Sequence, residues 1–294
     1  MIRSTIFNLL FYAFSFLIAM TCWIVAKVST RIAMWHVLKF WGRGVVVLLR
    51  IVMGAKVEVR GAHHMKPGQP QLIVSKHQSE LDIVMLAGAM WDVTAIAMKE
   101  LEKLPFFGTI LRKLDCVIVS VDSGPQGRTE QAIVGAKRIR DNKRSLVVYP
   151  EGELMKLGAR ERYRKGVGRI YEAVGIEVVP VAVSLGVIWP QRKWKKNAGT
   201  KAVMEFMEPI PPGLPFDDFM DEMERRIETR TWELIEETAP PDMLAEARDR
   251  RARGVNNHNQ VVTTDHIHPE GVGAIRRDEL GAGEHPGPRS PNVE

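Results

Sequence analysis

The chain begins with a long run of uncharged, mostly apolar residues. No charged side chain occurs from Ser4 to Ala26, and basic residues flank the run at Arg3, Lys27 and Arg31. A run of this length can cross or deeply enter a bilayer. A cleaved signal peptide would have a shorter apolar region and a small-residue cleavage site, and neither is evident. The pattern predicts a membrane anchor, and the competing interpretation is a core helix of a soluble protein.

A second apolar stretch, Val45–Met53, follows closely. Aromatic and basic residues border it, namely Trp35, Lys39, Phe40, Trp41, Arg43 and Arg50. The stretch is too short and too basic to span a bilayer alone, and such borders are typical of the membrane interface. We expect an interfacial helix that folds back against the first, with a core helix of the next domain as the alternative. Residues 1–54 are thus expected to form membrane-associated helices.

From residue 55 the pattern changes to short apolar runs separated by amphipathic segments. The runs that read as strands are 56–60, 71–75, 93–97, 117–121, 145–149, 178–184 and 202–206. Helical spacing appears at roughly 79–90, 127–141, 165–174 and 216–237. Strands that alternate with helices predict an α/β domain with a largely parallel or mixed central sheet over residues 55–239.

Beyond Pro240, large apolar residues become rare and Gly, Pro, Asn, His and Arg accumulate. Such a composition buries little apolar surface, so residues 240–294 are expected to be a disordered tail. A weak metal cluster is conceivable there, but scattered tail histidines usually have no such role; these are His258, His266, His268 and His285. We expect that removal of residues 245–294 leaves activity intact.

Composition narrows the function only slightly. Hydrophobic residues make up 45% and charged residues 26% of the 294 residues, as in ordinary folded proteins. Lys and Arg outnumber Asp and Glu by 41 to 35, which suits nucleic acid, anionic membranes or phosphate-bearing substrates. The basic residues are dispersed without a nucleic-acid-binding motif, and no G-x-S-x-G elbow indicates a serine hydrolase. Cys22 and Cys116 offer neither a disulfide framework nor a metal site.

The segment with the clearest chemical content directly follows the predicted strand 71–75. It reads Lys-His-Gln-Ser-Glu-Leu-Asp over residues 76–82. Ser79 and Asp82 alone make a helix-start signature, with Ser79 as the N-cap. His77 stands at a strand end, where α/β folds present ligand-binding loops. If the helix begins at Ser79, His77 can fold back so that Asp82 holds one imidazole nitrogen and the other is free as a base.

Residues 77–82 resemble the first motif of the glycerolipid acyltransferase family, to which the 1-acylglycerol-3-phosphate acyltransferases belong. Further segments are similar, in order and spacing, to the region before the second motif and to the third and fourth motifs: Lys99–Leu101 with Pro105–Gly108, Tyr149–Gly152, and Val179–Val183. A lone H-x-x-x-x-D is a weak signal, but four ordered motifs together are a strong one. The resemblance covers about residues 1–238, and the apolar N-terminus is similar to that of bacterial members.

The resemblance implies that acyl-CoA or acyl-carrier protein donates an acyl group to the sn-2 hydroxyl of 1-acylglycerol-3-phosphate, without a metal or organic cofactor. His77 would deprotonate that hydroxyl, Asp82 would orient His77, and backbone N–H groups after Ser79 would stabilise the oxyanion. A cytosolic donor and the charges flanking the anchor place the domain on the cytoplasmic face of the inner membrane. The residues expected to contact substrate are Ser79, Glu151, Gly152, Arg164, Lys165 and Pro180.

Two cations that the family usually carries are missing. The third motif usually reads Glu-Gly-Thr-Arg, whereas residues 151–154 read Glu-Gly-Glu-Leu; the second usually ends in Asp-Arg, whereas Ser123 follows Asp122. Arginine suits this role because it grips a phosphate with two hydrogen bonds. Three interpretations are open. Nearby cations take over the role of the missing arginines, or the acceptor lacks the phosphate, as a lyso-ornithine lipid does. In the third, the protein is an inactive membrane-associated binder. The candidate cations are Arg128, Lys156, Arg160, Arg162, Arg164 and Lys165.

Overall fold

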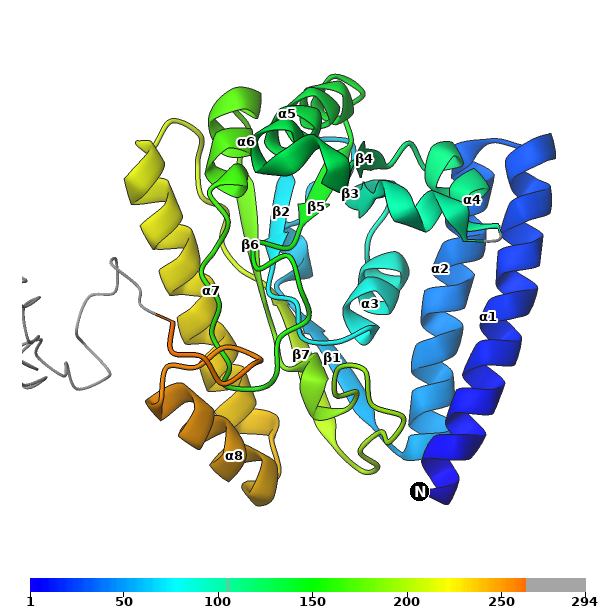
Figure 1. Cartoon of the computed structure of the whole chain (residues 1–294). Helices are drawn as coiled ribbons and strands as arrows, with labels where there is room; N and C mark the ends of the chain where they lie inside the picture. Colours follow the sequence, from blue (N-terminus) through cyan, green and yellow to red (C-terminus); the bar gives the residue numbers. More distant parts are fainter. Residues whose placement is uncertain (105, 263–294) are drawn as a thin grey trace, which may run out of the picture. The chain divides into compact units, whose positions relative to one another are not determined.

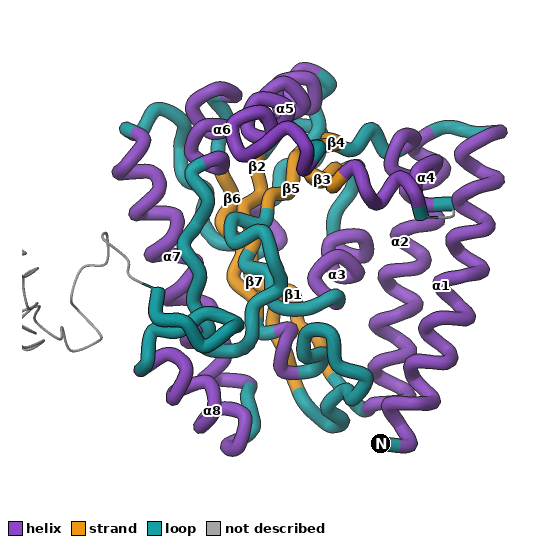
Figure 2. The backbone as a smooth tube through the Cα atoms, viewed as in Figure 1, coloured by secondary structure: helices purple, strands orange, loops and turns teal. Residues whose placement is uncertain are grey.

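A mixed seven-stranded sheet forms the centre of the fold (Figures 1 and 2). The computed structural model describes residues 1–104 and 106–262. The strand order is β1-β7-β6-β2-β5-β3-β4, and every neighbouring pair is parallel except β6 and β7. The strands are β1 Lys56–Arg60, β2 Leu72–Ser75, β3 Val93–Met98, β4 Val117–Val119, β5 Ser145–Val148, β6 Val178–Val183 and β7 Lys201–Phe206. All the expected strands are present, and the predicted α/β class with a mixed sheet is confirmed.

Helices cover both faces of this sheet. They are α1 Ile2–Val28, α2 Arg31–Leu48, α3 Leu81–Ala89, α4 Phe107–Lys113, α5 Gly124–Asp141, α6 Gly166–Val174, α7 Phe216–Thr238 and α8 Pro241–Ala252. Ile73 and Val147 pack in a core with α2 and α3, whereas Leu72 and Val148 pack in a core with α5, α6 and α7. The central strands β2, β5 and β6 are therefore buried along their whole length, which is why they read as continuous apolar runs.

The first two helices lie side by side, with α2 between α1 and α3 (Figure 1). Trp41 on α2 donates a hydrogen bond from Nε1 to Oγ of Ser15 on α1 at 3.0 Å. α2 and α3 approach closely at Gly42, where an added Cβ would lie only 2.6 Å from the backbone nitrogen of Gly88. The first helix pair is thus packed onto the sheet domain through α2, and α1 also contacts it directly through Phe7, whose ring packs edge-on against Trp189.

The expectation of a short interfacial helix at Val45–Met53 is wrong in its extent. This stretch ends a continuous helix that begins at Arg31 and finishes in a π-helical turn, Leu49–Met53. Val45 and Leu49 are fully buried in the domain core, as the alternative interpretation held. By length and composition alone, Ile2–Val28 and Arg31–Met53 are both apolar enough to cross a membrane.

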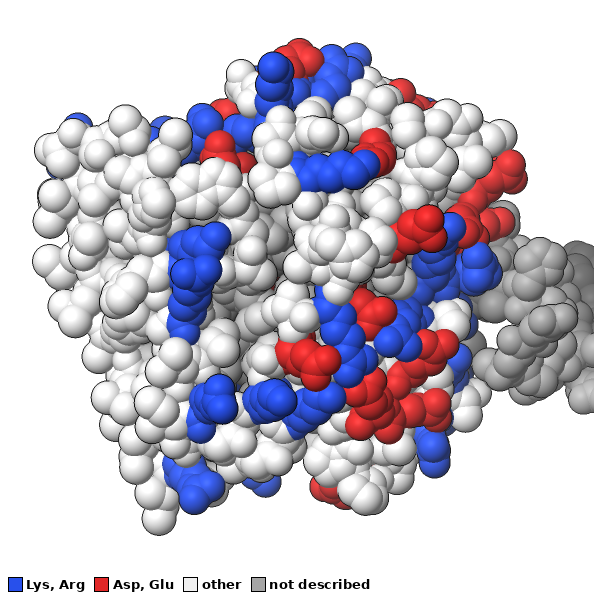
Figure 3. All heavy atoms as spheres, turned by 180° about the vertical axis from the view of Figure 1, so that it is seen from behind, with Lys and Arg blue, Asp and Glu red and all other residues white. Residues whose placement is uncertain are grey.

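α1 presents a broad apolar surface on its outer side. Its exposed large side chains are Ile2, Ile6, Leu9, Leu10, Tyr12, Phe16, Leu17, Met20, Trp23, Ile24 and Val28. Figure 3 shows a nearly uncharged area along this edge of the molecule. A continuous apolar surface of this extent marks an interaction site, and its helical form suits a bilayer. These features indicate that the protein associates with membranes.

The segment after Pro240 departs from the expected disordered tail, because it is folded up to residue 262. α8 is followed by a turn that the bridge between Val255 and Val261 closes. Its few apolar side chains suffice because they pack on a surface that already exists: Ala247 is buried against Leu157 and Ile235. The expectation for residues 263–294, with the three histidines in them, lies outside the described residues. Within the described ranges, no cluster of three metal-ligating side chains occurs.

Candidate active site

The predicted catalytic residues lie in the loop between β2 and α3. β2 is flanked by β5 and β6, and all three strands run in the same direction. The loops that follow β2 and β5 therefore leave the same edge of the sheet, where α/β folds place their ligands. The two loops touch, since the backbone N–H of Met155 donates a hydrogen bond to the carbonyl oxygen of His77 at 2.6 Å.

The structure brings His77 and Asp82 together as the sequence predicts. Asp82 is fully buried, and its Oδ2 atom lies 2.8 Å from His77 Nδ1. The same oxygen accepts hydrogen bonds from the backbone N–H groups of Gln78 and Ser79, at 2.7 and 3.0 Å. Burial raises the pKa of the Asp82 carboxyl, and the three hydrogen bonds oppose that rise. The carboxylate is thereby fixed in position, and it fixes Nδ1 of His77.

The ring of Tyr149 also helps to fix the orientation of the His77 imidazole. It stacks on His77 with the ring centroids 3.9 Å apart and an interplanar angle of 19°. Burial raises the pKa of the Tyr149 phenol well above its ordinary value, so this neighbour is uncharged. His77 is 15% exposed, and within the described chain its Nε2 atom has no hydrogen-bond partner. The arrangement can present Nε2 to a ligand as a base.

Four backbone amides at the start of α3 are already used. Those of Gln78 and Ser79 donate to Asp82, that of Leu81 donates to Ser79 Oγ, and that of Asp82 donates to the Ser79 carbonyl. The expectation that these groups stabilise an oxyanion is therefore not supported. Ser79 itself is fully buried, and its hydroxyl donates to the carbonyl oxygen of Trp189 and accepts from the backbone N–H of Leu81. The expectation that α3 begins at Ser79 is wrong, because the helix begins at Leu81 with Glu80 at the N-cap position.

Glu151 belongs to a buried ionic network that the sequence did not reveal. The ammonium group of Lys76 lies 3.0 Å from Glu151 Oε1 and donates a hydrogen bond to Glu228 Oε1 at 2.6 Å. The hydroxyl of Tyr163 donates to the same Glu228 oxygen at 2.9 Å. Burial lowers the pKa of Lys76, but attraction to the two carboxylates outweighs burial, so its pKa lies above the ordinary value. Glu151 thus anchors its loop to β2 and α7 instead of facing substrate.

Gly152, the next residue, lies under an exposed arginine. Its φ angle is +72°, and an added Cβ would come within 2.3 Å of Cζ of Arg164. The left-handed backbone favours glycine at this position, and the guanidinium group lies directly over it. Arg164 is exposed, and within the described chain no carboxylate pairs with it. Lys165 follows as the N-cap residue of α6.

The structure also separates the other candidate cations. Nζ of Lys156 donates a hydrogen bond to the carbonyl oxygen of Asn257 at 2.7 Å. The backbone N–H of Arg160 donates one to the carbonyl oxygen of Val255. Both residues are thus tied to the segment after α8. Arg164 and Lys165 remain at the exposed start of α6, next to Gly152. Of the proposed substitutes for the missing arginines, these two are placed best.

Pro180 is the site candidate whose position fits least. It lies inside β6, fully enclosed in the sheet and in register with Val74. Its carbonyl oxygen accepts a hydrogen bond from the backbone N–H of Met207 at 2.9 Å. The segment that resembles the fourth motif is therefore a core strand at this position, and contact of Pro180 with substrate is not supported.

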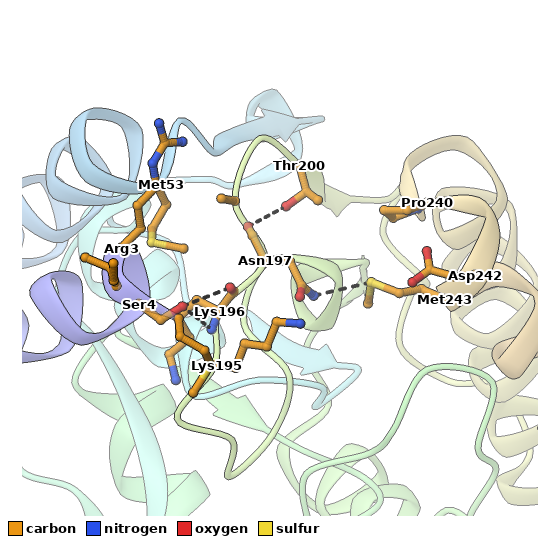
Figure 4. A pocket seen from close by; sticks show the side chains of 13 residues that line it. Arg3, Ser4, Met53, Lys195, Lys196, Asn197, Thr200, Pro240, Asp242 and Met243 are labelled. Carbon is orange, nitrogen blue, oxygen red and sulfur yellow. Dashed lines mark hydrogen bonds between the residues drawn. The ribbon is translucent and has the colours of Figure 1, made fainter.

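A cavity of about 640 Å³ lies elsewhere, between the start of α1, the loop 195–200 and the start of α8 (Figure 4). Ser4 Oγ bonds the backbone of Lys196 there, and Asn197 contacts the sulfur of Met243. Figure 4 shows the guanidinium of Arg3 directed away from Lys195. None of the predicted site residues lines this cavity.

Comparison with known proteins agrees with this site. A family model described as acyltransferase matches residues 56–184, from β1 to the residue after β6. The 1-acyl-sn-glycerol-3-phosphate acyltransferase of Pseudomonas aeruginosa is 28% identical over 204 residues, which is 69% of this chain and 79% of that protein. The human 1-acyl-sn-glycerol-3-phosphate acyltransferase alpha is 27% identical over 58% of this chain and 60% of its own length. These comparisons support membership of the glycerolipid acyltransferase family.

The fold is that of a solved acyltransferase as well. The crystal structure of the 1-acyl-sn-glycerophosphate (LPA) acyltransferase PlsC from Thermotoga maritima aligns with a TM-score of 0.67 at 21% identity. It covers 79% of this chain and 96% of that one. The family resemblance stated from the motifs is thus confirmed, and this acyltransferase carries its His77–Asp82 pair on the family's sheet.

The cluster around Lys76 also gives the acyltransferase a pH-dependent stability. Burial and the charge of Glu228 raise the pKa of Glu224 to about 7, from 4.5. The folded state therefore binds this proton more tightly than the unfolded state. Its stabilising effect is complete below pH 4.5 and is lost as the pH rises through about 7. We expect Glu224→Gln to raise the free energy of unfolding by roughly 1–3 kcal/mol at pH 8 and to change little at pH 4.5.

Chemical denaturation of the detergent-solubilised protein at the two pH values measures this effect. Glu236→Gln, which replaces an exposed glutamate on the same helix, is the matched control and should show no such difference. An equal effect of Glu224→Gln at both pH values would contradict the assignment.

Proposed function

We propose that this acyltransferase transfers a fatty acyl group from acyl-CoA or acyl-carrier protein to the sn-2 hydroxyl of 1-acylglycerol-3-phosphate, giving phosphatidic acid. The observation that carries the proposal is the His77–Asp82 pair, with Nδ1 held at 2.8 Å and Nε2 free. The names of the relatives support the same acceptor. The reaction needs a base for a hydroxyl group, and His77 is the residue placed to be that base.

In this mechanism Nε2 of His77 takes the proton of the acceptor hydroxyl while the oxygen attacks the thioester carbonyl. Asp82 accepts the Nδ1–H hydrogen bond and stabilises the imidazolium that forms. The tetrahedral intermediate then collapses, the C–S bond breaks, and the leaving thiolate receives the proton from His77. The nucleophile is the substrate itself, so no covalent acyl-enzyme is required.

Arg164 and Lys165 are the proposed partners of the acceptor phosphate. They precede α6, so its first backbone N–H groups and positive dipole end lie beside them. The guanidinium over Gly152 stands in the loop that directly follows Tyr149, the residue stacked on His77. This placement supports the interpretation that nearby cations replace the missing arginines, rather than an acceptor without a phosphate.

The membrane side of the reaction fits the same scheme. The apolar surface of α1 would enter the lipid phase that supplies the acceptor, and α2 would connect that surface to α3, whose first turn carries Asp82. We assign the catalytic domain to the cytoplasmic face of the inner membrane, because thioester donors are made in the cytosol and basic residues flank the first helix.

The proposal is tested with purified protein in detergent. Transfer of a labelled acyl group is measured from acyl-CoA and from acyl-carrier protein, onto lysophosphatidic acid and onto a lysolipid without a phosphate. Turnover on lysophosphatidic acid that His77→Ala abolishes would support the proposal. Turnover only on the phosphate-free acceptor would mean that lysophosphatidic acid is not the acceptor. No turnover from a folded protein would favour the interpretation that the protein is a non-catalytic membrane-associated binder.

We expect Arg164→Leu to raise KM for lysophosphatidic acid by about 10- to 100-fold with a much smaller change in kcat, because it removes a charged hydrogen bond to the phosphate. The KM for a phosphate-free acceptor should not change. Arg162→Leu removes an exposed cation two residues away and is the matched control. If both variants raise KM equally, the loop acts through general charge and Arg164 has no specific role.

A further inference from the structure

The folded segment after Pro240 lies against the loop that follows β5. We call residues 241–262 the strap and residues 150–165 the third-motif loop. In Figure 1 the green loop that follows β5 runs down to the orange segment after α8. Arg250 on α8 donates a hydrogen bond to the carbonyl oxygen of Leu157 at 3.0 Å. The backbone N–H of Arg160 donates one to the carbonyl oxygen of Val255 at 3.0 Å. The strap thus holds this loop at several points.

Asn257 makes the most specific of these contacts. It is only 9% exposed, and its amide bonds the backbone of the third-motif loop in two directions. Nδ2 donates to the carbonyl oxygen of Leu154 at 2.6 Å, and Oδ1 accepts from the backbone N–H of Lys156 at 2.9 Å. One side chain therefore binds the backbone on both sides of Met155, as a neighbouring β-strand would.

Met155 is the residue of the third-motif loop that contacts His77. Its backbone N–H donates to the His77 carbonyl oxygen at 2.6 Å. Its flanking backbone groups are held by Asn257, so the position of this N–H depends on the strap. A displacement of residues 154–156 would be transmitted to the backbone of His77, whose ring lies between Tyr149 and Asp82.

The turn that carries Asn257 is itself built to be rigid. Oδ1 of Asn256 accepts hydrogen bonds from the backbone N–H groups of His258 and Gln260, at 2.9 and 3.1 Å. Oδ1 of Asn257 also accepts a bond from Gln191 Nε2 at 3.3 Å, which ties the turn to the loop after β6. The strap lies outside residues 56–184, the part of the chain that the family model matches.

We propose that Asn257 is a positioning residue for His77, acting through residues 154–156, and that the strap is part of the catalytic apparatus of this chain. The inference rests on the proposed role of His77 as the base. It replaces the expectation that residues 245–294 are dispensable, because their removal takes away Asn257 and the strap contacts made by Arg250 and Val255.

The test compares Asn257→Ala and Asn257→Asp with the full-length wild type. The aspartate keeps the acceptor for Lys156 but cannot donate to Leu154. His258→Ala is the matched control, since His258 is the exposed neighbour on the same turn. We expect both Asn257 variants to lower kcat by about tenfold or more with KM within about twofold, because His77 is misplaced while substrate binding persists.

Amide hydrogen exchange without substrate gives a second measurement that does not depend on activity. Exchange at Met155 and Lys156 and in residues 76–79 should be faster in the Asn257 variants and unchanged in His258→Ala. A kcat within about twofold of the wild type would overturn the proposal. So would a loss of activity with faster exchange throughout the protein, because Asn257 would then serve stability in general.

The two proposals can fail separately. If the wild type transfers no acyl group, the proposed function fails, and the exchange data still decide whether Asn257 orders the backbone of residues 76–79. If the wild type is active but exchange there is unchanged in both variants, the coupling between Asn257 and His77 is refuted.

Discussion

Asp82→Asn is expected to lower kcat by about 10³- to 10⁴-fold with little change in KM. Oδ2 of Asp82 accepts hydrogen bonds from His77 Nδ1 and from two backbone amides. An asparagine can offer its oxygen to the amides, but it then no longer carries the charge that stabilises the imidazolium. If its nitrogen faces His77 instead, it holds the wrong tautomer, with the proton on Nε2. Steady-state kinetics of acyl transfer measures the effect.

Asp218→Asn removes an exposed carboxylate on α7 and is the matched control. Thermal unfolding of both variants separates loss of catalysis from loss of fold, because a buried Asn in place of the charged acceptor also weakens two backbone hydrogen bonds. A folded Asp82→Asn variant that keeps more than about a tenth of the wild-type kcat would contradict a role for Asp82 in orienting and charging His77.

Much of this fold is readable from the sequence, because its central strands are short apolar runs between amphipathic helices. β2, β5 and β6 are buried on both faces, so each is apolar without alternation. The sequence pattern failed where a short segment folds only on a surface made by others. α8 has few apolar residues, yet Ala247 is buried against Leu157 and Ile235.

In the candidate site, the sequence predicts contacts between residues that are close in the chain but not contacts between residues that are far apart. His77 and Asp82 are five residues apart across a helix start, so their contact follows from local geometry. Lys76 and Glu228 are 152 positions apart, and Asn257 and Leu154 are 103 apart. No local pattern marks such partners. The signal available was Lys76 itself, a charge placed directly after a fully buried strand.

The buried network around that lysine leads to the second large effect. Lys76→Met is expected to lower the free energy of unfolding by about 3–5 kcal/mol, because it leaves Glu151 and Glu228 without their counter-charge. The side chains of Lys76 and Glu151 are 2% and 0% exposed, and that of Glu228 is 17% exposed. Attraction to Lys76 keeps the pKa of Glu228 below its ordinary value although burial raises it, so the variant would force this carboxylate toward protonation.

Lys66→Met provides a control that is matched in distance and differs in burial. Lys66 Nζ lies 2.6 Å from Glu177, the same distance as Lys76 from Glu228, but its side chain is 45% exposed. Exposed pairs contribute about 0–1 kcal/mol, so denaturant titration should resolve the two variants clearly.

Adding Glu151→Gln and Glu228→Gln to Lys76→Met should recover much of the lost stability. The loss in Lys76→Met comes from leaving buried charges unpaired rather than from a missing attraction. An equal loss in Lys66→Met, or no recovery in the triple variant, would contradict this account. Since Lys76 precedes His77 and Glu151 precedes Gly152, the same network fixes the spacing of the two loops that form the site.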